Sequence, residues 1–257
     1  MHDLSVTVLC SGSIGNSVLI SSDGSGILID AGLSCRELDR RMALFGVEPR
    51  QVEAVVLTHE HTDHTRGAKR FCTEHRIPVY GTRGTLALTP LDGVDAKVIR
   101  AGKSLQIGQF KASPFKVNHL AAEPIALSVS LGSKKIGVAT DLGSFNARVV
   151  EAMSGSNLML VESNYDEQML LNGDYPGFLK RAIRGDHGHL SNDDAARLSQ
   201  MAASENTSGI VLVHLSKDNN TPEKALHAVT EQIGISKHGP GVHVTAHGGC
   251  SGPYRLR

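Results

Sequence analysis

Short apolar runs, many of them alternating with polar residues, predict β-strands along most of this chain. A helix is also predicted in the first third, at 35–46, where Leu38, Met42 and Phe45 share one face and Gly46 provides a stop. A second helix is expected to end near His75. The predicted strands of this first block lie at 4–10, 16–22, 26–32, 52–58 and 77–81, with Gly-rich and Ser-rich turns between several of them.

The second block begins with β-type patterns from about residue 98 to residue 140 and then alternates strands with helices. Strands are predicted at 157–163, 209–216 and 241–249, and helices at 175–185, 191–204 and 221–234. Two β-rich blocks, each followed by helices, predict an α/β protein with two stacked sheets in the middle and helices outside. Because the chain contains no linker-like stretch or internal repeat, residues 1–257 are expected to form a single domain.

Composition narrows the possible functions. The 257 residues contain 26 Lys and Arg and 26 Asp and Glu, and the zero net charge argues against a protein that coats nucleic acid or a membrane surface. No apolar run approaches the roughly 18 residues of a membrane span, and the N-terminus does not resemble a signal peptide. Four cysteines without CxxC spacing suit a reducing compartment, so a cytoplasmic location is expected.

The chain contains 13 histidines, and three of them lie in the sequence HEHTDH, directly after a predicted strand. The candidate ligands in this segment are His59, His61, Asp63 and His64. Imidazole and carboxylate groups suit zinc, manganese or iron. The alternative, a His-rich surface loop, is weakened by the context of the motif.

Three more potential ligands stand at the ends of apolar strands: His119, Asp141 and His214. Each one alone could simply cap a turn. Since strand ends commonly present functional groups on short loops, three further occurrences favour a common site. Together the seven side chains suffice for two metal ions, with Asp141 able to bridge them.

These motifs resemble the metallo-β-lactamase fold, an αββα four-layer sandwich, and the resemblance covers essentially the whole chain. Within that superfamily the chain is most similar to the YycJ/WalJ-type exonucleases. The strings that carry the resemblance are SGSIGNS (11–17), LIDAGLSCRELDRRM (28–42), LTHEHTDHTRGA (57–68), NHLAAEP (118–124), ATDLG (139–143), ESNYDEQML (162–170), GDHGHLSNDDAA (185–196) and VHLSKDNNTPE (213–223).

The resemblance implies a role for each of the seven residues. His59, His61 and His119 would hold one divalent transition-metal ion. Asp63, His64 and His214 would hold a second, with Asp141 bridging, so that Asp63 and Asp141 also count as catalytic. The resemblance also implies that Asp30 supports the metal loop by a hydrogen bond.

Other residues are assigned more loosely. His189 resembles the histidine that related phosphodiesterases place over the leaving group, where it would act as a general acid, although a structural turn histidine, or competition from His187, is the alternative. Glu162 would support His189 or another group of the site. Substrate contacts are expected from Ser11, Ser13, Asn16 and Asn219. His243 and His247 are expected on one face of the last strand, in packing or supporting roles, while His2, His75, His227 and His238 are expected on the surface.

The leading functional hypothesis is a two-metal phosphodiesterase in which a hydroxide shared by the metals attacks phosphorus. The resemblance implies a nucleic-acid substrate, with 5′-to-3′ digestion of DNA expected, and no membrane or obligate protein partner. Two clusters of basic residues are candidate phosphate contacts, though each could equally be a solvated helix face: Arg66, Lys69 and Arg70, and Lys180, Arg181 and Arg184.

Several alternatives stay open. A hydrolase of this fold could act on a thioester, a lactone or a cyclic phosphodiester, and a metal-stabilised nucleic-acid-binding module is the non-enzyme alternative. A transfer-RNA 3′-processing nuclease would need a substrate-gripping arm, and the sequence has no long Gly/Pro-rich insertion. A β-CASP nuclease would need a large inserted domain, but only 72 residues separate Asp141 from His214.

Overall fold

Two seven-stranded sheets form the centre of the computed structural model, which describes residues 3–234 and 240–256. The first sheet has the order β14-β1-β2-β3-β4-β5-β6. Its strands are β1 (Leu4–Cys10), β2 (Ser17–Ser22), β3 (Ser25–Ile29), β4 (Val52–Val56), β5 (Val79–Gly81), β6 (Ala96–Val98) and β14 (Ser251–Leu256).

The second sheet has the order β13-β12-β11-β10-β9-β8-β7. Its strands are β7 (Leu105–Ile107), β8 (Phe110–Lys116), β9 (Ile125–Leu131), β10 (Lys134–Ala139), β11 (Leu158–Glu162), β12 (Gly209–Val213) and β13 (Gly241–Val244). Strands β10 to β13 run parallel, so their carboxyl ends meet at one edge of the sheet.

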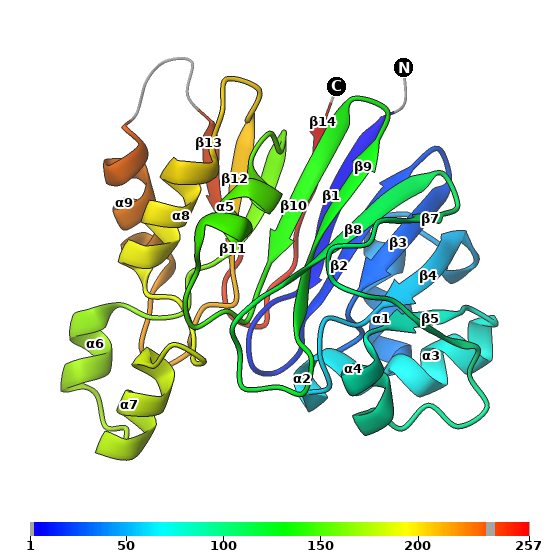
Figure 1. Ribbon diagram of the computed structural model, residues 1–257, viewed down its shortest axis with the longest axis horizontal. Helices are drawn as coiled ribbons and strands as arrows, with labels where there is room; N and C mark the ends of the chain where they lie inside the picture. Colours follow the sequence, from blue (N-terminus) through cyan, green and yellow to red (C-terminus); the bar gives the residue numbers. More distant parts are fainter. Residues whose placement is uncertain (1–2, 235–239, 257) are drawn as a thin grey trace.

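Helices cover the outer face of each sheet (Figure 1). Those of the first half are α1 (Cys35–Leu44), α2 (Thr62–Thr65), α3 (Ala68–His75) and α4 (Arg83–Leu88), with a 3-10 turn at Pro49–Gln51. Those of the second half are α5 (Ala147–Met153), α6 (Glu167–Asn172), α7 (Gly177–Arg184), α8 (Asn192–Ala202) and α9 (Pro222–Ile233). Within the described residues, no helix combines the length and apolar character that a membrane crossing requires.

Three apolar layers hold this arrangement together. Side chains such as Val6 and Ile27 of the first sheet and Leu127 and Val211 of the second form the core between the sheets. A second layer joins the second sheet to α5, α8 and α9, and a third joins the first sheet to α1 and α3. Two sheets between two helical layers confirm the predicted αββα sandwich.

The last strands differ from their predicted course. β13 ends at Val244, so His247 does not share a strand with His243. β14, which the sequence pattern did not predict, pairs antiparallel with β1 at the edge of the first sheet. Its Pro253 cannot donate a hydrogen bond to a neighbouring strand, and an edge position tolerates this defect.

Candidate metal centre

The HEHTDH segment turns sharply after β4 and brings its side chains to one end of the first sheet. The rings of His59 and His61 lie 4.5 Å apart, centre to centre, and those of His59 and His64 lie 4.1 Å apart. The short helix α2 begins at Thr62 and carries Asp63 and His64. A strand followed at once by a turn and a helix thus concentrates four potential ligands within six residues.

The second sheet supplies the other three potential ligands from separate strand ends. His119 follows β8, Asp141 follows β10 and His214 follows β12. Asp141 and His214 have φ angles of 55° and 59°, a left-handed conformation that costs energy in residues other than glycine. Because each strained residue comes directly after a strand or one residue later, the backbone turns its side chain into the gap between the sheets.

Atoms from the two sheets meet at three points. His119 Nε2 lies 3.3 Å from His61 Nδ1, and Asp141 Oδ2 lies 2.9 Å from His64 Nε2. His214 Nε2 lies 3.9 Å from Asp63 Oδ2. In each of four groups, one ligand atom per residue lies within 4.8 Å of the others: His59, His61 and His119; Asp63, His64 and His214; His59, His64 and Asp141; and Asp141, Glu162, His189 and His214.

Asp30 orients the first-sheet side of this centre. Its carboxylate accepts hydrogen bonds from the Thr58 N–H at 2.8 Å and the Thr58 hydroxyl at 2.8 Å, and its Oδ2 lies 2.7 Å from His64 Nδ1. Gly32 lies so close to α2 that a Cβ there would come within 1.7 Å of the Asp63 carbonyl oxygen. The segment after β3 is therefore packed directly against the residues that carry the ligands.

Glu162 has the equivalent position on the second sheet. It is completely buried, and its Oε1 lies 2.7 Å from His189 Nδ1 and 2.8 Å from His214 Nδ1. Its Oε2 accepts a hydrogen bond of 2.8 Å from the Leu142 N–H, next to Asp141. One carboxylate thus fixes His189, His214 and the loop that carries Asp141.

A cavity opens over this centre and is bounded on one side by α7. It is lined by Ser13, His61, Asp63, His119, Asp141, Asn164, Tyr175, Leu179, Ile183, His189, His214, Leu215 and Ser216. His189 lines it directly, whereas the exposed His187 lies in a neighbouring hollow with Leu120. Of the two histidines, His189 is therefore the one that shares this cavity with five of the seven potential ligands.

The electrostatics of the centre favour neutral imidazole at some positions and charged groups at others. Burial, reinforced by the neighbouring His64, lowers the pKa of His59 well below its ordinary value, so His59 is a neutral base with a free lone pair. Burial raises the pKa of Asp141, but the His214 and His64 imidazoles outweigh it and bring the pKa well below the usual range. Burial lowers the pKa of His214, and Asp141 and other carboxylates outweigh it and raise the pKa to about 10. The carboxylates of the centre thus attract positive charge.

Comparison with known proteins agrees with this geometry. Residues 26–215 match the family model described as Beta-lactamase superfamily domain. The chain belongs to the beta-lactamase superfamily. It is also 34% identical over 235 residues to the exodeoxyribonuclease YycJ of Bacillus anthracis, covering 90% of this chain and 89% of the relative. The exodeoxyribonuclease WalJ of Streptococcus pneumoniae is 30% identical over 243 residues, covering 92% of this chain and 90% of the relative.

Solved structures of the superfamily share the architecture. The metallo-beta-lactamase fold protein YhfI from Bacillus subtilis superposes with a TM-score of 0.75 at 18% identity, covering 98% of this chain and 99% of YhfI. At that identity the likeness establishes the fold. Together with the exonuclease relatives, superfamily membership makes this chain a metal-dependent hydrolase.

The superfamily implies bound divalent metal, and the residues present fit it. His59 Nε2 and His214 Nε2 are buried nitrogen atoms without a hydrogen-bond partner among the described residues. An unpartnered buried nitrogen is costly unless a further group or ion bonds to it. Nitrogen and carboxylate oxygen donors in this arrangement suit zinc, manganese or iron.

Three of the four predicted substrate contacts face protein groups instead of the cavity. The Ser11 hydroxyl accepts a hydrogen bond of 2.7 Å from the His214 N–H. Asn16 is buried, with its amide nitrogen 3.1 Å from Asp63 Oδ2, and Asn219 is buried beside Asp166. Only Ser13 lines the cavity, so Ser13 alone is carried forward as a substrate contact.

Most of the predicted basic contacts are also engaged with the protein. Lys69 pairs with Asp92, Arg70 with Glu74 and Arg184 with Glu167. The side chains of Arg66 and Lys180 donate to backbone carbonyls, that of Arg66 to Ile14. Arg181 is exposed on α7, the helix whose Leu179 and Ile183 line the cavity, and is therefore kept as the candidate phosphate contact.

Sequence reasoning overlooked three residues that shape the centre. The Thr58 hydroxyl lies 3.0 Å from His59 Nδ1 and links that ring to Asp30. Asn164 donates a hydrogen bond of 2.8 Å to the His214 carbonyl, and Tyr175 lines the cavity. The positions of Thr58, immediately before the motif, and of Asn164, directly after the strand predicted at 157–163, were signals available in the sequence, whereas Tyr175 had none.

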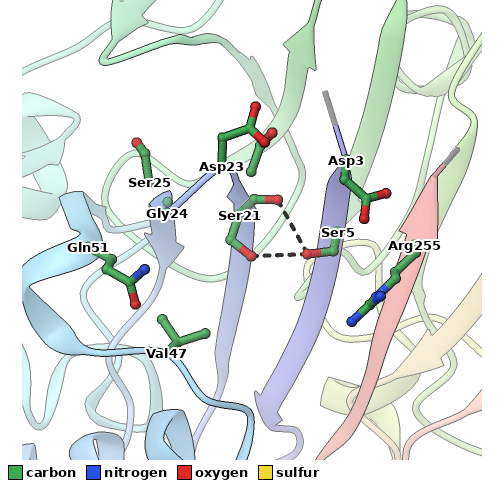
Figure 2. Close-up of a pocket in the computed structure, with 11 residues that line it drawn as sticks. Asp3, Ser5, Ser21, Asp23, Gly24, Ser25, Val47, Gln51 and Arg255 are labelled. Atoms are coloured by element: carbon green, nitrogen blue, oxygen red, sulfur yellow. Dashed lines mark hydrogen bonds between the residues drawn. The ribbon is translucent and has the colours of Figure 1, made fainter. Parts of the chain in front are cut away.

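Another hollow lies at the opposite end of the first sheet, near the start of β1 and the end of β2 (Figure 2). It is lined mainly by small polar residues, and the Ser5 hydroxyl lies 3.0 Å from the Ser21 hydroxyl. None of the seven potential ligands lines it. The seven potential ligands are therefore gathered at the other end of the sheet.

Proposed function

We propose that this chain, folded as one domain, is a two-metal phosphodiesterase that digests DNA from the 5′ end. The observation that carries the proposal is the meeting of His59, His61 and His119 with Asp63, His64 and His214 around Asp141. The exodeoxyribonuclease relatives favour DNA among the possible nucleic acids.

Zinc or manganese ions in the two groups would supply Lewis-acid polarisation of phosphate oxygens and a nucleophile available at neutral pH. The side chains of the chain have complementary tasks. Asp141, with its oxygens facing His64 on one side and His119 and His214 on the other, bridges the two groups. Glu162 and Asp30 hold the ligand rings in the required tautomer and orientation.

His189 is placed to protonate the leaving oxygen. Its Nδ1 is held by Glu162, which leaves Nε2 for the cavity. Burial lowers the pKa of His189, but Glu162 outweighs this effect and the pKa is raised above its ordinary value. A histidine that keeps its proton near neutral pH is suited to general acid catalysis. Ser13 and Arg181 are the proposed contacts to substrate phosphate.

The proposal is tested with single-stranded and double-stranded DNA and RNA labelled at either end. We expect metal-dependent release of the label from 5′-labelled DNA as a short product and progressive shortening of 3′-labelled DNA, both lost on chelation and restored by manganese or zinc. Cleavage of thioesters or lactones without nuclease activity would assign the chain to the small-molecule hydrolases. Binding of DNA without any metal-dependent turnover would indicate a binding module, and both of these results would contradict the proposal.

A further inference from the structure

A separate group of four potential ligand side chains lies between α1 and α3. Cys35 and Asp39 stand one turn apart on α1, and Glu74 and His75 end α3. One sulfur, oxygen or nitrogen atom from each lies within 4.8 Å of the others. These helices pack on the outer face of the first sheet, away from the gap that holds the histidine-rich centre.

The distances within this group resemble those around a bound ion. Cys35 Sγ lies 3.7 Å from Asp39 Oδ2, 3.7 Å from Glu74 Oε2 and 4.0 Å from His75 Nε2. His75 Nε2 lies 3.0 Å from Asp39 Oδ1. Ligands about 2.0–2.3 Å from a tetrahedral zinc ion are roughly 3.3–3.8 Å from one another. These four separations differ from that range by about half an ångström or less.

The chemistry of the group also indicates a cation. Cys35 is 3% exposed, and its single thiol proton can satisfy only one of the two carboxylates that its sulfur faces. A divalent cation among these groups would face the sulfur and both carboxylates at once, with the thiol proton released to solvent when the metal binds.

We propose that Cys35, Asp39, Glu74 and His75 form a further metal site of the zinc class, with one sulfur, one nitrogen and two oxygen donors. Four protein ligands leave no open position for a substrate, so the site is structural. His75, which the sequence analysis placed on the surface, is half-buried with its ring against Phe71.

The position of the group between α1 and α3 indicates what a metal ion there would stabilise. α1 follows the segment that carries Asp30 and Gly32, and α3 follows α2 with Asp63 and His64. Backbone bonds of 2.8 Å join these segments, from the Ala31 N–H to the His64 carbonyl and from the Gly67 N–H to the Ala31 carbonyl. A metal ion that clips α1 to α3 would hold the supporting segment against the ligand-bearing one. This inference does not depend on the proposed function.

The test is titration of the chelator-treated full chain with cobalt(II), followed by its thiolate-to-cobalt charge-transfer absorption in the near ultraviolet. The seven residues of the histidine-rich centre include no thiol, so that centre cannot produce this signal. We expect cobalt to produce a band whose final intensity corresponds to one thiolate-bound ion per chain, whatever the centre around Asp141 takes up, and zinc to abolish it. Cys35→Ser should lose the band, whereas Cys72→Ser and Cys250→Ser should keep it.

Variants of the other proposed ligands, which keep Cys35, show whether a lost band reflects a lost metal site or a misfolded chain. Glu74 is exposed, so Glu74→Gln should fold normally, and both it and His75→Ala should lower cobalt affinity and the zinc content per chain by up to one ion. No band in the wild-type protein, or a band that survives Cys35→Ser, would overturn the proposal. So would unchanged cobalt binding in Glu74→Gln and His75→Ala, which would leave a simple contact between His75 and Asp39.

Discussion

The two sides of the histidine-rich centre are built in different ways. The first sheet contributes His59, His61, Asp63 and His64 from one short segment after β4. The second sheet contributes His119, Asp141 and His214 from three strand ends that are far apart in the sequence. The first side depends on a local turn and the second on the register of parallel strands. Each side has one buried carboxylate behind it, Asp30 on the first and Glu162 on the second.

The largest loss of activity is expected from changing Asp141, the residue proposed to bridge the two sides. Asp141→Ala should lose at least one metal ion and lower the rate by about 10⁴-fold or more, because losing a metal removes several kcal/mol of transition-state stabilisation. Metal content per chain and single-turnover rates measure this. The control is Asp92→Ala, which removes an exposed carboxylate that pairs with Lys69. Full occupancy together with full activity would exclude the bridging role of Asp141.

A smaller loss of turnover is expected from changing His189, which lies on the second side but is not a proposed ligand. His189→Ala should keep both metals and lower turnover by about 10²–10⁴-fold, the range typical of general acid catalysis. The defect should shrink on a phosphodiester with a p-nitrophenolate leaving group, which departs without a proton. His187→Ala is the matched control, since His187 is exposed beside the centre. Equal losses on both substrates would indicate phosphate binding, and loss of metal would make His189 a ligand.

The supporting carboxylates allow the two sides to be compared directly. Asp30→Asn and Glu162→Gln should each weaken metal binding by about 10–100-fold, as removal of supporting carboxylates typically does. Only Glu162→Gln should also lower turnover at saturating metal, because of these two carboxylates it is Glu162 that contacts His189. Ser21→Ala, in the hollow at the far end of the sheet, should leave metal affinity unchanged. Identical turnover in the two carboxylate variants would show that the sides are not specialised in this way.

The sequence predicted the layered fold and the residues of the first side because both depend on local patterns. Apolar strands and the spacing of HEHTDH are visible without knowing the tertiary structure. The second side could be anticipated only because His119, Asp141 and His214 each follow a strand. The parallel pairing of β10, β11 and β12 then brings two of these strand ends together.

Local patterns could not predict which polar side chains are buried in the folded chain. Ser11 and Asn16 lie in a polar loop, which suggested substrate contact, but the loop folds beneath the ligands and both side chains are buried. The group around Cys35 and His75 was also not visible, because it depends on how α1 packs against α3. The edge strand β14 was overlooked since Gly252 and Pro253 interrupt its pattern.

The central claim, that the two sides together hold two metal ions, is tested most directly by crystals of the zinc- or manganese-loaded protein. Anomalous diffraction at the absorption edge of the metal should show two peaks about 3.5–4 Å apart. One should lie among His59, His61 and His119, and the other among Asp63, His64 and His214, with Asp141 between them. A single peak in this centre, or peaks that contact only one of the two sides, would contradict the account.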